Sequence, residues 1–408
     1  MSRAEALRNA MVGQLIDWCV ITGDSPVAHA MRHVPRDLFV PGTDLERAYA
    51  QEAVVTHTDA AGTAISSVSA PAVVASMLEQ LHLQPGQRVL EIGTGPGYNA
   101  LLLADLVGPT GAVTTVEIDP RVAADATRTL AELGPSHLSV ICADGDHGYP
   151  AHAPYDRIIV TAGAWQVPAT WRNQLAPGGR IVVPLRLNGL TRSLAFELDD
   201  DGIWRSRSAD ECGFIPMRGH GGVAEHNMRI GPAGQPLVVL RTDDDRAINP
   251  AALHDALNRP PVLLWTGVSD AWGQCEHLDL WLADLPSFCR VLVMGHATAA
   301  GLTPPQHSWG SMGAATDTAV AYLTLRPLGE EESGVEIGVA AYGQDAESLA
   351  RHVADRVYAW HHAGGGDGHL LVELRPDNDS GPLPGDARLT IAKGDLHVVV
   401  RIVQPVPQ

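Results

Sequence analysis

The stretch RVLEIGTGPGYNA, residues 88–100, constrains the fold of this chain more than any other. A short apolar run ends in three alternating glycines, Gly93, Gly95 and Gly97, and the helical pattern YNALLLADLV follows directly. Glycine tolerates positive φ and allows close approach to a ligand, and a helix N-terminus directs backbone N–H groups and positive charge at one point. The stretch therefore predicts a strand, a ligand-binding loop and a helix.

Four further β-rich runs follow: AVTTVEI, LSVICA, DRIIVTA and RIVVPL, the first three spaced by helical patterns. This alternation predicts right-handed crossovers and a parallel sheet covered on both faces. After Pro184, the runs LTRSLAFEL and IWRSRSADECGFIP flank a turn-like DDDG, which predicts an antiparallel hairpin at the sheet edge. The fold class is α/β and Rossmann-like.

A chain of 408 residues suggests more than one domain. The pattern predicts an N-terminal helical and substrate-loop region over residues 1–80 and a ligand-binding core over 81–220. A segment rich in Gly, Pro and Asp, residues 221–250, is interpreted as a linker. Residues 251–408 are interpreted as a separate α+β domain, because the core looks complete without it.

Charge and cysteine usage exclude several classes of protein. Asp and Glu number 47 against 28 Lys and Arg, for a formal net charge of −19. This argues against nucleic acid and anionic membranes as main partners. No run approaches the ~18 apolar residues of a membrane span, and five scattered cysteines without CxxC spacing indicate reduced thiols and no zinc site. We expect a cytoplasmic protein without a metal.

The glycine spacing differs from the GxGxxG of dinucleotide-binding folds and resembles the loop of S-adenosylmethionine (SAM) methyltransferases. Glu117, in VEIDP, follows Gly97 at about the ~20 residues where an acidic side chain binds a ribose. Asp144 and Gly145, in ADGDHG, are expected near the adenine. The alternative is an ordinary strand–helix turn with a solvated Glu117. The residues expected to bind SAM are Glu91, Gly93, Thr94, Gly95, Gly97, Asn99, Glu117, Ile118, Asp144, Gly145 and Thr161.

Longer motifs resemble one family. AMRHVPRDLFVP (residues 30–41) and AYAQEAV are similar to the start of protein-L-isoaspartate O-methyltransferases, and APYDRIIVTAGA, QLAPGGRIVVPL and CGFIPMRG continue the likeness in order. The resemblance covers about residues 5–220. It implies a SAM-dependent carboxyl O-methyltransferase that acts on a peptide or protein with aspartyl or isoaspartyl residues. Because the methyltransferase part looks complete by itself, residues 251–408 are expected to recognise the peptide substrate.

Two features depart from that family. The loop GTAISSVSAP is longer than the usual Gly-x-Thr-Ile-Ser-x-Pro, and the chain continues to residue 408 beyond the usual end. Both resemble homologues associated with lanthipeptides, lasso peptides and graspetides, which methylate a chosen aspartate in a precursor peptide so that the ester closes to an aspartimide. That activity is the preferred interpretation. The alternatives are general repair of isoaspartyl proteins and a SAM-binding module without turnover.

A carboxylate acceptor is ionised at neutral pH, with a reference pKa near ~4, so methyl transfer to it requires no general base. Catalysis then depends on positioning and exclusion of water. The hydroxyls of Ser66, Ser67 and Ser69 are suited to orient the acceptor, and by resemblance Ser69 falls at the family's acceptor-site serine. The alternative for these serines is a solvated turn that caps a helix starting near Pro71.

Overall fold

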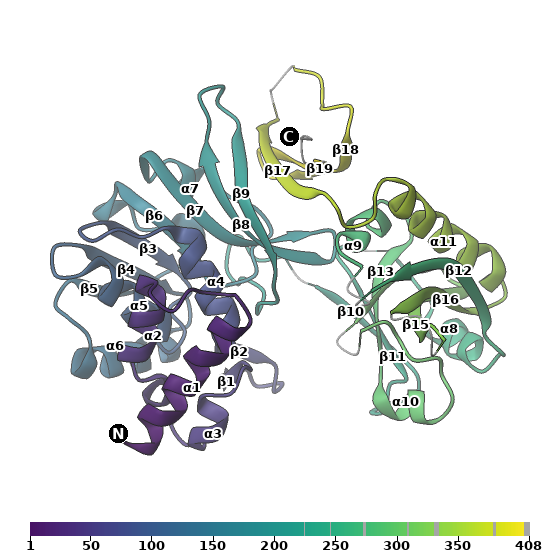
Figure 1. Ribbon diagram of the computed structural model, residues 1–408, viewed down its shortest axis with the longest axis horizontal. Helices are drawn as coiled ribbons and strands as arrows, with labels where there is room; N and C mark the ends of the chain where they lie inside the picture. The colour runs from purple at the N-terminus through teal and green to yellow at the C-terminus, as the bar shows by residue number, and fades with distance from the viewer. Residues whose placement is uncertain are drawn as a thin grey trace.

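The computed structural model describes residues 1–223, 225–244, 246–271, 275–307, 310–329, 334–377 and 381–403. Within these residues, two large β-sheets lie in neighbouring lobes (Figure 1). The first sheet has the strand order β5-β4-β3-β6-β7-β8-β9-β17-β19-β18, and the second has the order β10-β11-β13-β14-β15-β16-β12.

The N-terminal region is helical and ends in a small hairpin. Its elements are α1 (Arg3–Asp17), α2 (Pro26–His33), η1 (Arg36–Phe39), α3 (Leu45–Ala48), the hairpin strands β1 (Val54–Thr58) and β2 (Ala64–Val68), and α4 (Pro71–Leu81). Ser2 and Glu5 form a capping box at α1, and Ser25 caps α2 just before Pro26 at its first position. The sequence thus sets these helix starts locally.

The core of the first sheet follows the predicted alternation. Its elements are β3 (Arg88–Ile92), α5 (Tyr98–Val107), β4 (Ala112–Glu117), α6 (Pro120–Leu133), β5 (Leu138–Cys142), η2 (Gly145–His147), η3 (Pro150–His152), β6 (Tyr155–Val160), α7 (Ala169–Arg172), β7 (Leu175–Leu187), β8 (Leu190–Leu198) and β9 (Trp204–Glu211). Strands β3 to β7 pair in parallel, and β8 and β9 add the antiparallel hairpin. The α/β fold predicted from the sequence is confirmed.

Alternate strand residues face opposite layers of this sheet. Leu90 and Ile158 belong to one hydrophobic cluster, whereas their neighbours Val89 and Ile159 belong to another. All four side chains are buried. Both faces are therefore covered, as a parallel sheet requires.

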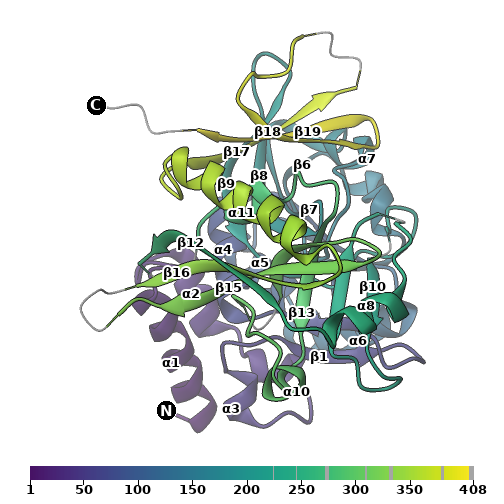
Figure 2. The ribbon, with the colours of Figure 1, turned by 90° about the vertical axis from the view of Figure 1, so that its right-hand side faces the viewer.

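The second sheet is antiparallel throughout its described pairings. Its elements are β10 (His226–Ile230), β11 (Val238–Thr242), α8 (Pro250–Leu257), β12 (Val262–Asp270), α9 (Leu278–Leu282), β13 (Phe288–Val293), α10 (Gly295–Ala299), β14 (Ser311–Ala315), β15 (Ala319–Pro327), β16 (Val335–Gly343) and α11 (Ala346–His362). The long helix α11 lies across one face of it (Figure 2).

The boundaries expected from the sequence differ from the structure in two places. Residues 221–250, expected to be a linker, contain β10 and β11 of the second sheet. The last strands, β17 (His369–Pro376), β18 (Ala387–Lys393) and β19 (Leu396–Val403), return to the first sheet, where Leu374 pairs with Trp204 of β9. Strand pairing between distant segments leaves no local signal, so composition alone misplaced both boundaries.

The two lobes also share one apolar core. Leu185 and Leu194 of the first sheet, Leu278 of α9, Val339 of the second sheet and Val372 of β17 belong to a single cluster of buried residues. Part of the core beyond residue 250 is therefore continuous with that of the first sheet, while other buried residues of the second sheet form a cluster of their own.

Candidate active site

A cavity of about 530 Å³ opens at the carboxyl ends of β3, β4 and β6, the edge at which open α/β sheets bind ligands. The glycine loop forms one wall, β2 and Ser69 form a second, and residues 213–218 form a third. Eleven of the residues predicted for cofactor and acceptor lie on these walls: Ser66, Ser67, Ser69, Gly93, Thr94, Gly95, Asn99, Glu117, Ile118, Gly145 and Thr161.

Two glycines of the loop cannot be replaced without strain. Gly93 has a φ of +100°, and a Cβ there would lie 2.8 Å from Oγ1 of Thr161. Gly97, the N-cap of α5, also has a φ of +100°, and a Cβ there would lie 2.9 Å from Cδ1 of Leu130. Only glycine combines this conformation with such close neighbours.

Glu91 supports the loop from behind and is not part of the cavity wall. Its fully buried carboxylate accepts hydrogen bonds from Nδ2 of Asn99 at 2.8 Å and from Oγ1 of Thr115 at 2.6 Å. Thr115 in turn lies 2.7 Å from Oγ1 of Thr94 in the loop. Burial raises the pKa of Glu91 to about 7 despite these two hydrogen bonds. Gly97 likewise lies behind the wall.

Glu117 stands at the end of β4, facing the loop. One carboxylate oxygen accepts the N–H of Gly95 at 3.0 Å, and the other accepts the N–H of Asp119 at 3.0 Å. Nη2 of Arg218 lies 3.8 Å from the second oxygen. The predicted ribose-binding carboxylate therefore lies on the cavity wall beside the glycine backbone.

Asp144 lies outside the cavity wall. Its carboxylate accepts the N–H of Asp146, where it caps η2, and the N–H of His220 at 2.8 Å. A Cβ on Gly219 would lie 2.4 Å from its Oδ2, so the segment after residue 217 covers this side chain. The predicted adenine contact of Asp144 stays a prediction, whereas Gly145 lies on the wall.

The acceptor serines differ in their surroundings. Ser66 is buried, and its Oγ accepts a hydrogen bond from Thr56 at 3.1 Å. In the described part of the chain, the hydroxyls of Ser67 and Ser69 have no hydrogen-bond partner, although both residues line the cavity. Ala70 occupies the N-cap of α4 without a side-chain hydrogen bond, so Ser69 does not cap that helix.

Arg36 positions this wall and was not singled out in the sequence. Its completely buried guanidinium donates to the carbonyl of Ala48 at 2.8 Å, of Glu52 at 3.2 Å and of Val68 at 3.4 Å. Burial lowers its pKa. Arg36 thus ties the N-terminal helices to the residue just before Ser69. The sequence signal for a buried arginine is its position within the mostly apolar stretch VPRDLFVP.

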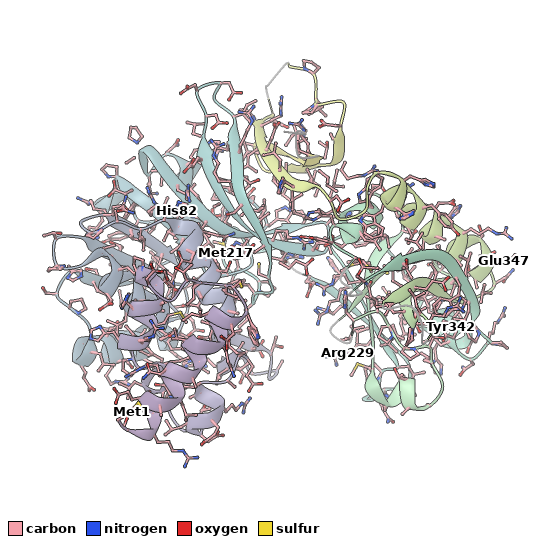
Figure 3. The ribbon with its side chains drawn as sticks, viewed as in Figure 1. Met1, His82, Met217, Arg229, Tyr342 and Glu347 are labelled. Atoms are coloured by element: carbon pink, nitrogen blue, oxygen red, sulfur yellow. The ribbon has the colours of Figure 1, made fainter. Side chains whose placement is uncertain are left out.

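Two further wall residues belong to the lobe of the second sheet: Arg241 lies on β11, and Glu225 lies just before β10. Figure 3 marks the two sides: Met217 belongs to the lobe of the first sheet, and Arg229 belongs to β10 in the lobe of the second. Sequence reasoning had no means of finding these residues, because the pairing that places them is long-range.

The residues on the walls fit SAM. The cavity has the size of a small-molecule site, the glycine loop lines it, and Glu117, predicted to bind a ribose, places a carboxylate on its wall. Among the described residues, no group of three or more His, Cys, Asp and Glu side chains is arranged to hold a metal ion. Every helix in the described ranges is too short or too polar to span a bilayer.

The sheet, the glycine loop and Glu117 define a SAM-dependent methyltransferase. Residues 6–221 match the family described as protein-L-isoaspartate(D-aspartate) O-methyltransferase (PCMT), and the chain belongs to this family. It is therefore a SAM-dependent carboxyl O-methyltransferase. Relatives named protein-L-isoaspartate O-methyltransferase include one from Methanopyrus kandleri, 41% identical over 49% of this chain and 86% of its own length. Another, from Methanothermobacter thermautotrophicus, is 36% identical over 54% of this chain and 98% of its own.

A solved structure named protein-L-isoaspartate O-methyltransferase is similar in fold over 90% of this chain and 96% of its own, with a TM-score of 0.50 and 23% identity. Its coverage extends well beyond residue 221.

Proposed function

We propose that this protein methylates the carboxylate of isoaspartyl residues in peptides or proteins, as a repair enzyme does. The observation that carries the proposal is the shared cavity, which is lined by the glycine loop and Glu117 together with Ser67 and Ser69, whose hydroxyls have no partner among the described residues. The family and its named relatives support this reading above the maturation of a precursor peptide.

Different residues of the cavity wall bind SAM, orient the acceptor carboxylate and exclude water. The glycine loop and Glu117 hold SAM, which supplies an electrophilic methyl group to a carboxylate oxygen. Ser67 and Ser69 orient that carboxylate through hydroxyl donors. Val73, Met77 and Phe214 give the wall an apolar surface that excludes water from the acceptor.

No side chain has to remove a proton. The acceptor carboxylate is ionised at neutral pH, so a hydroxyl donor that orients it is sufficient, and positioning supplies the rate enhancement. The methoxy group of the ester leaves more readily than the oxygen of a carboxylate. The following backbone nitrogen then attacks the ester carbonyl, a succinimide forms, and methanol leaves with the amide proton. Hydrolysis of the succinimide returns part of the isoaspartate to aspartate.

A second candidate function is methylation of a chosen aspartate in a modified precursor peptide. The observation in its favour is the long acceptor loop, which forms the hairpin strand β2 along the cavity, with Ser66 and Ser67 both on its wall. A wall built partly by the second sheet also suits a substrate larger than a single residue.

Mass spectrometry with SAM tests the two functions. The substrates are an isoaspartyl peptide, its aspartyl twin, and a cyclised precursor peptide encoded beside the gene. One added methyl on the isoaspartyl peptide alone supports repair. One added methyl followed by loss of methanol on the precursor alone supports peptide maturation, and no methyl transfer to any substrate contradicts both.

A further inference from the structure

Arg241 of β11 is the feature of the cavity that the methyl-transfer chemistry leaves unexplained. It lines the same cavity as Ser67 and Ser69, yet it belongs to the second sheet. Its strand is central, because Arg241 pairs with Asn227 of β10 on one side and Arg290 of β13 on the other. A strand held on both sides presents this side chain from a rigid position.

Among the described residues, the guanidinium of Arg241 has no partner. In the described ranges, no hydrogen bond or ion pair joins it to another residue, and its Nε is buried without an acceptor. Arg218, on the same cavity, contrasts with it, since Arg218 lies 3.4 Å from Asp119. A buried N–H without an acceptor costs free energy unless something else supplies one.

The neighbours of Arg241 do not neutralise it. Glu225 also lines the cavity, but its carboxylate accepts a hydrogen bond from Asn227 at 3.3 Å and forms no ion pair with Arg241. Arg290 beside it adds positive charge, and after burial, Arg241 is the largest charge that lowers the pKa of Arg290. This part of the wall therefore favours an anion in a protein whose net charge is −19.

The second sheet is also fixed firmly enough to position such a contact. Arg192 of β8 forms a buried ion pair with Asp279 of α9, and Arg186 of β7 forms another with Asp243, two residues after Arg241. The amide of Asn188 donates to the carbonyl of Ala283 as well. These contacts join the lobes on either side of the cavity.

We propose that Arg241 determines substrate specificity by binding a second carboxylate of the peptide, close to the residue that is methylated. A guanidinium matches a carboxylate through two parallel hydrogen bonds. The second carboxylate comes from a neighbouring acidic side chain or from the C-terminus of the peptide. The proposal rests on the peptide-methylating function above and adds a preference that the function does not itself require.

The experiment compares wild-type protein with Arg241→Gln, Arg241→Lys and the control Arg229→Gln, an exposed arginine on the adjacent strand. The substrates are isoaspartyl peptides of one length with Glu or Gln one to three residues from the acceptor, each with a free or amidated C-terminus. We expect wild type to favour one carboxylate-bearing peptide by about 10- to 100-fold in KM, the range for a hydrogen bond to a charged group.

Arg241→Gln should remove that preference with kcat little changed, Arg241→Lys should retain part of it, and Arg229→Gln should retain all of it. The peptide whose preference disappears shows whether the side chain or the C-terminus is bound. An equal effect of Arg241→Gln on every peptide, or no effect, overturns the proposal. Melting temperatures show whether a variant is folded. If Arg241→Gln does not fold, the partial loss of preference expected for Arg241→Lys tests the proposal instead.

Direct binding separates this proposal from the function on which it rests. The same peptides carry a fluorophore, and anisotropy gives their Kd for protein saturated with S-adenosylhomocysteine. If wild type methylates no isoaspartyl peptide, the repair function fails, while a carboxylate preference in Kd that is lost in Arg241→Gln still supports the specificity. If methylation occurs without any carboxylate preference in KM or Kd, the specificity alone fails.

Discussion

Glu91 is the residue through which pH acts on the glycine loop. Its carboxylate is fully buried, and burial raises its pKa from 4.5 to about 7. Between these values the folded protein holds a proton that the unfolded chain releases. The free energy of unfolding therefore falls as pH rises from about 4.5 to 7, by about 3 kcal/mol, and stays at the lower level above that range.

The variant Glu91→Gln should remove this slope. Its amide can accept from Asn99 and donate to Thr115, so the contacts that hold the loop persist. Urea unfolding at pH 5, 6, 7 and 8 measures the effect, and we expect a nearly constant free energy of unfolding for the variant. The exposed Glu132→Gln on α6 is the control, and an unchanged slope in Glu91→Gln would contradict the assignment.

Replacement of Ser69 is expected to change the activity of the protein but not its stability. The Ser69 hydroxyl makes no hydrogen bond in the described part of the protein, so Ser69→Ala should change the free energy of unfolding by less than about 0.5 kcal/mol. Loss of a hydrogen bond to the acceptor carboxylate should lower kcat/KM for an isoaspartyl peptide by about 10- to 100-fold. Steady-state methylation measures this, with Ser139→Ala on β5 as the matched control. Wild-type activity in Ser69→Ala would refute the positioning role.

At the scale of elements, the hairpin β1–β2 carries two of the acceptor serines and is held at both ends. Arg36 binds the carbonyl of Val68 at one end. On the other strand, Nε2 of His57 lies 3.1 Å from Oδ2 of Asp125 on α6. The hydrogen bond to His57, with help from Arg128, lowers the pKa of Asp125.

Removing the contact between His57 and Asp125 should make the hairpin more mobile without unfolding the protein. Because Asp125 is half exposed, Asp125→Asn should cost less than about 1 kcal/mol overall. Amide exchange by mass spectrometry should speed up in residues 54–68 and stay the same in β5. The control is Asp105→Asn, which removes a similar contact, with His33 at 2.7 Å. Equal amide exchange of residues 54–68 in both variants would show that the contact between His57 and Asp125 does not hold the hairpin.

At the scale of the whole molecule, Glu373 joins the end of the chain to the first sheet. It is almost fully buried on β17 and accepts from Arg375 at 2.7 Å, Arg401 at 3.2 Å and Arg205 of β9 at 3.3 Å. Burial on its own would raise the pKa of Glu373, but the hydrogen bonds and charges of Arg375 and Arg205 together outweigh burial, and the pKa is lowered. Its stabilisation is thus present above about pH 4.5 and is lost as pH falls.

Replacement of that carboxylate leaves three arginines facing a neutral group. We expect Glu373→Gln to lower the free energy of unfolding by about 3–5 kcal/mol at pH 7, and by less at pH 4. Urea unfolding at the two values measures the difference. Asp386→Asn, which removes an exposed partner of Arg401, should cost less than about 1 kcal/mol at either pH. Equal losses of unfolding free energy in both variants would show that Glu373 does not hold β17 to the first sheet.

The sequence by itself determined the helix starts, the order of β3 to β9 and the glycine loop, because caps, periodicity and positive-φ turns are local properties. It also predicted Glu117 and Ser69 as site residues, and both lie on the cavity wall because they stand at fixed offsets from those elements. The tertiary structure decided the rest. In the folded protein, Glu91 and Asp144 lie outside the cavity wall, β17 pairs with β9, and Arg241 lines the cavity. Each of these depends on contacts between segments far apart in the chain, for which neighbouring residues carry no signal.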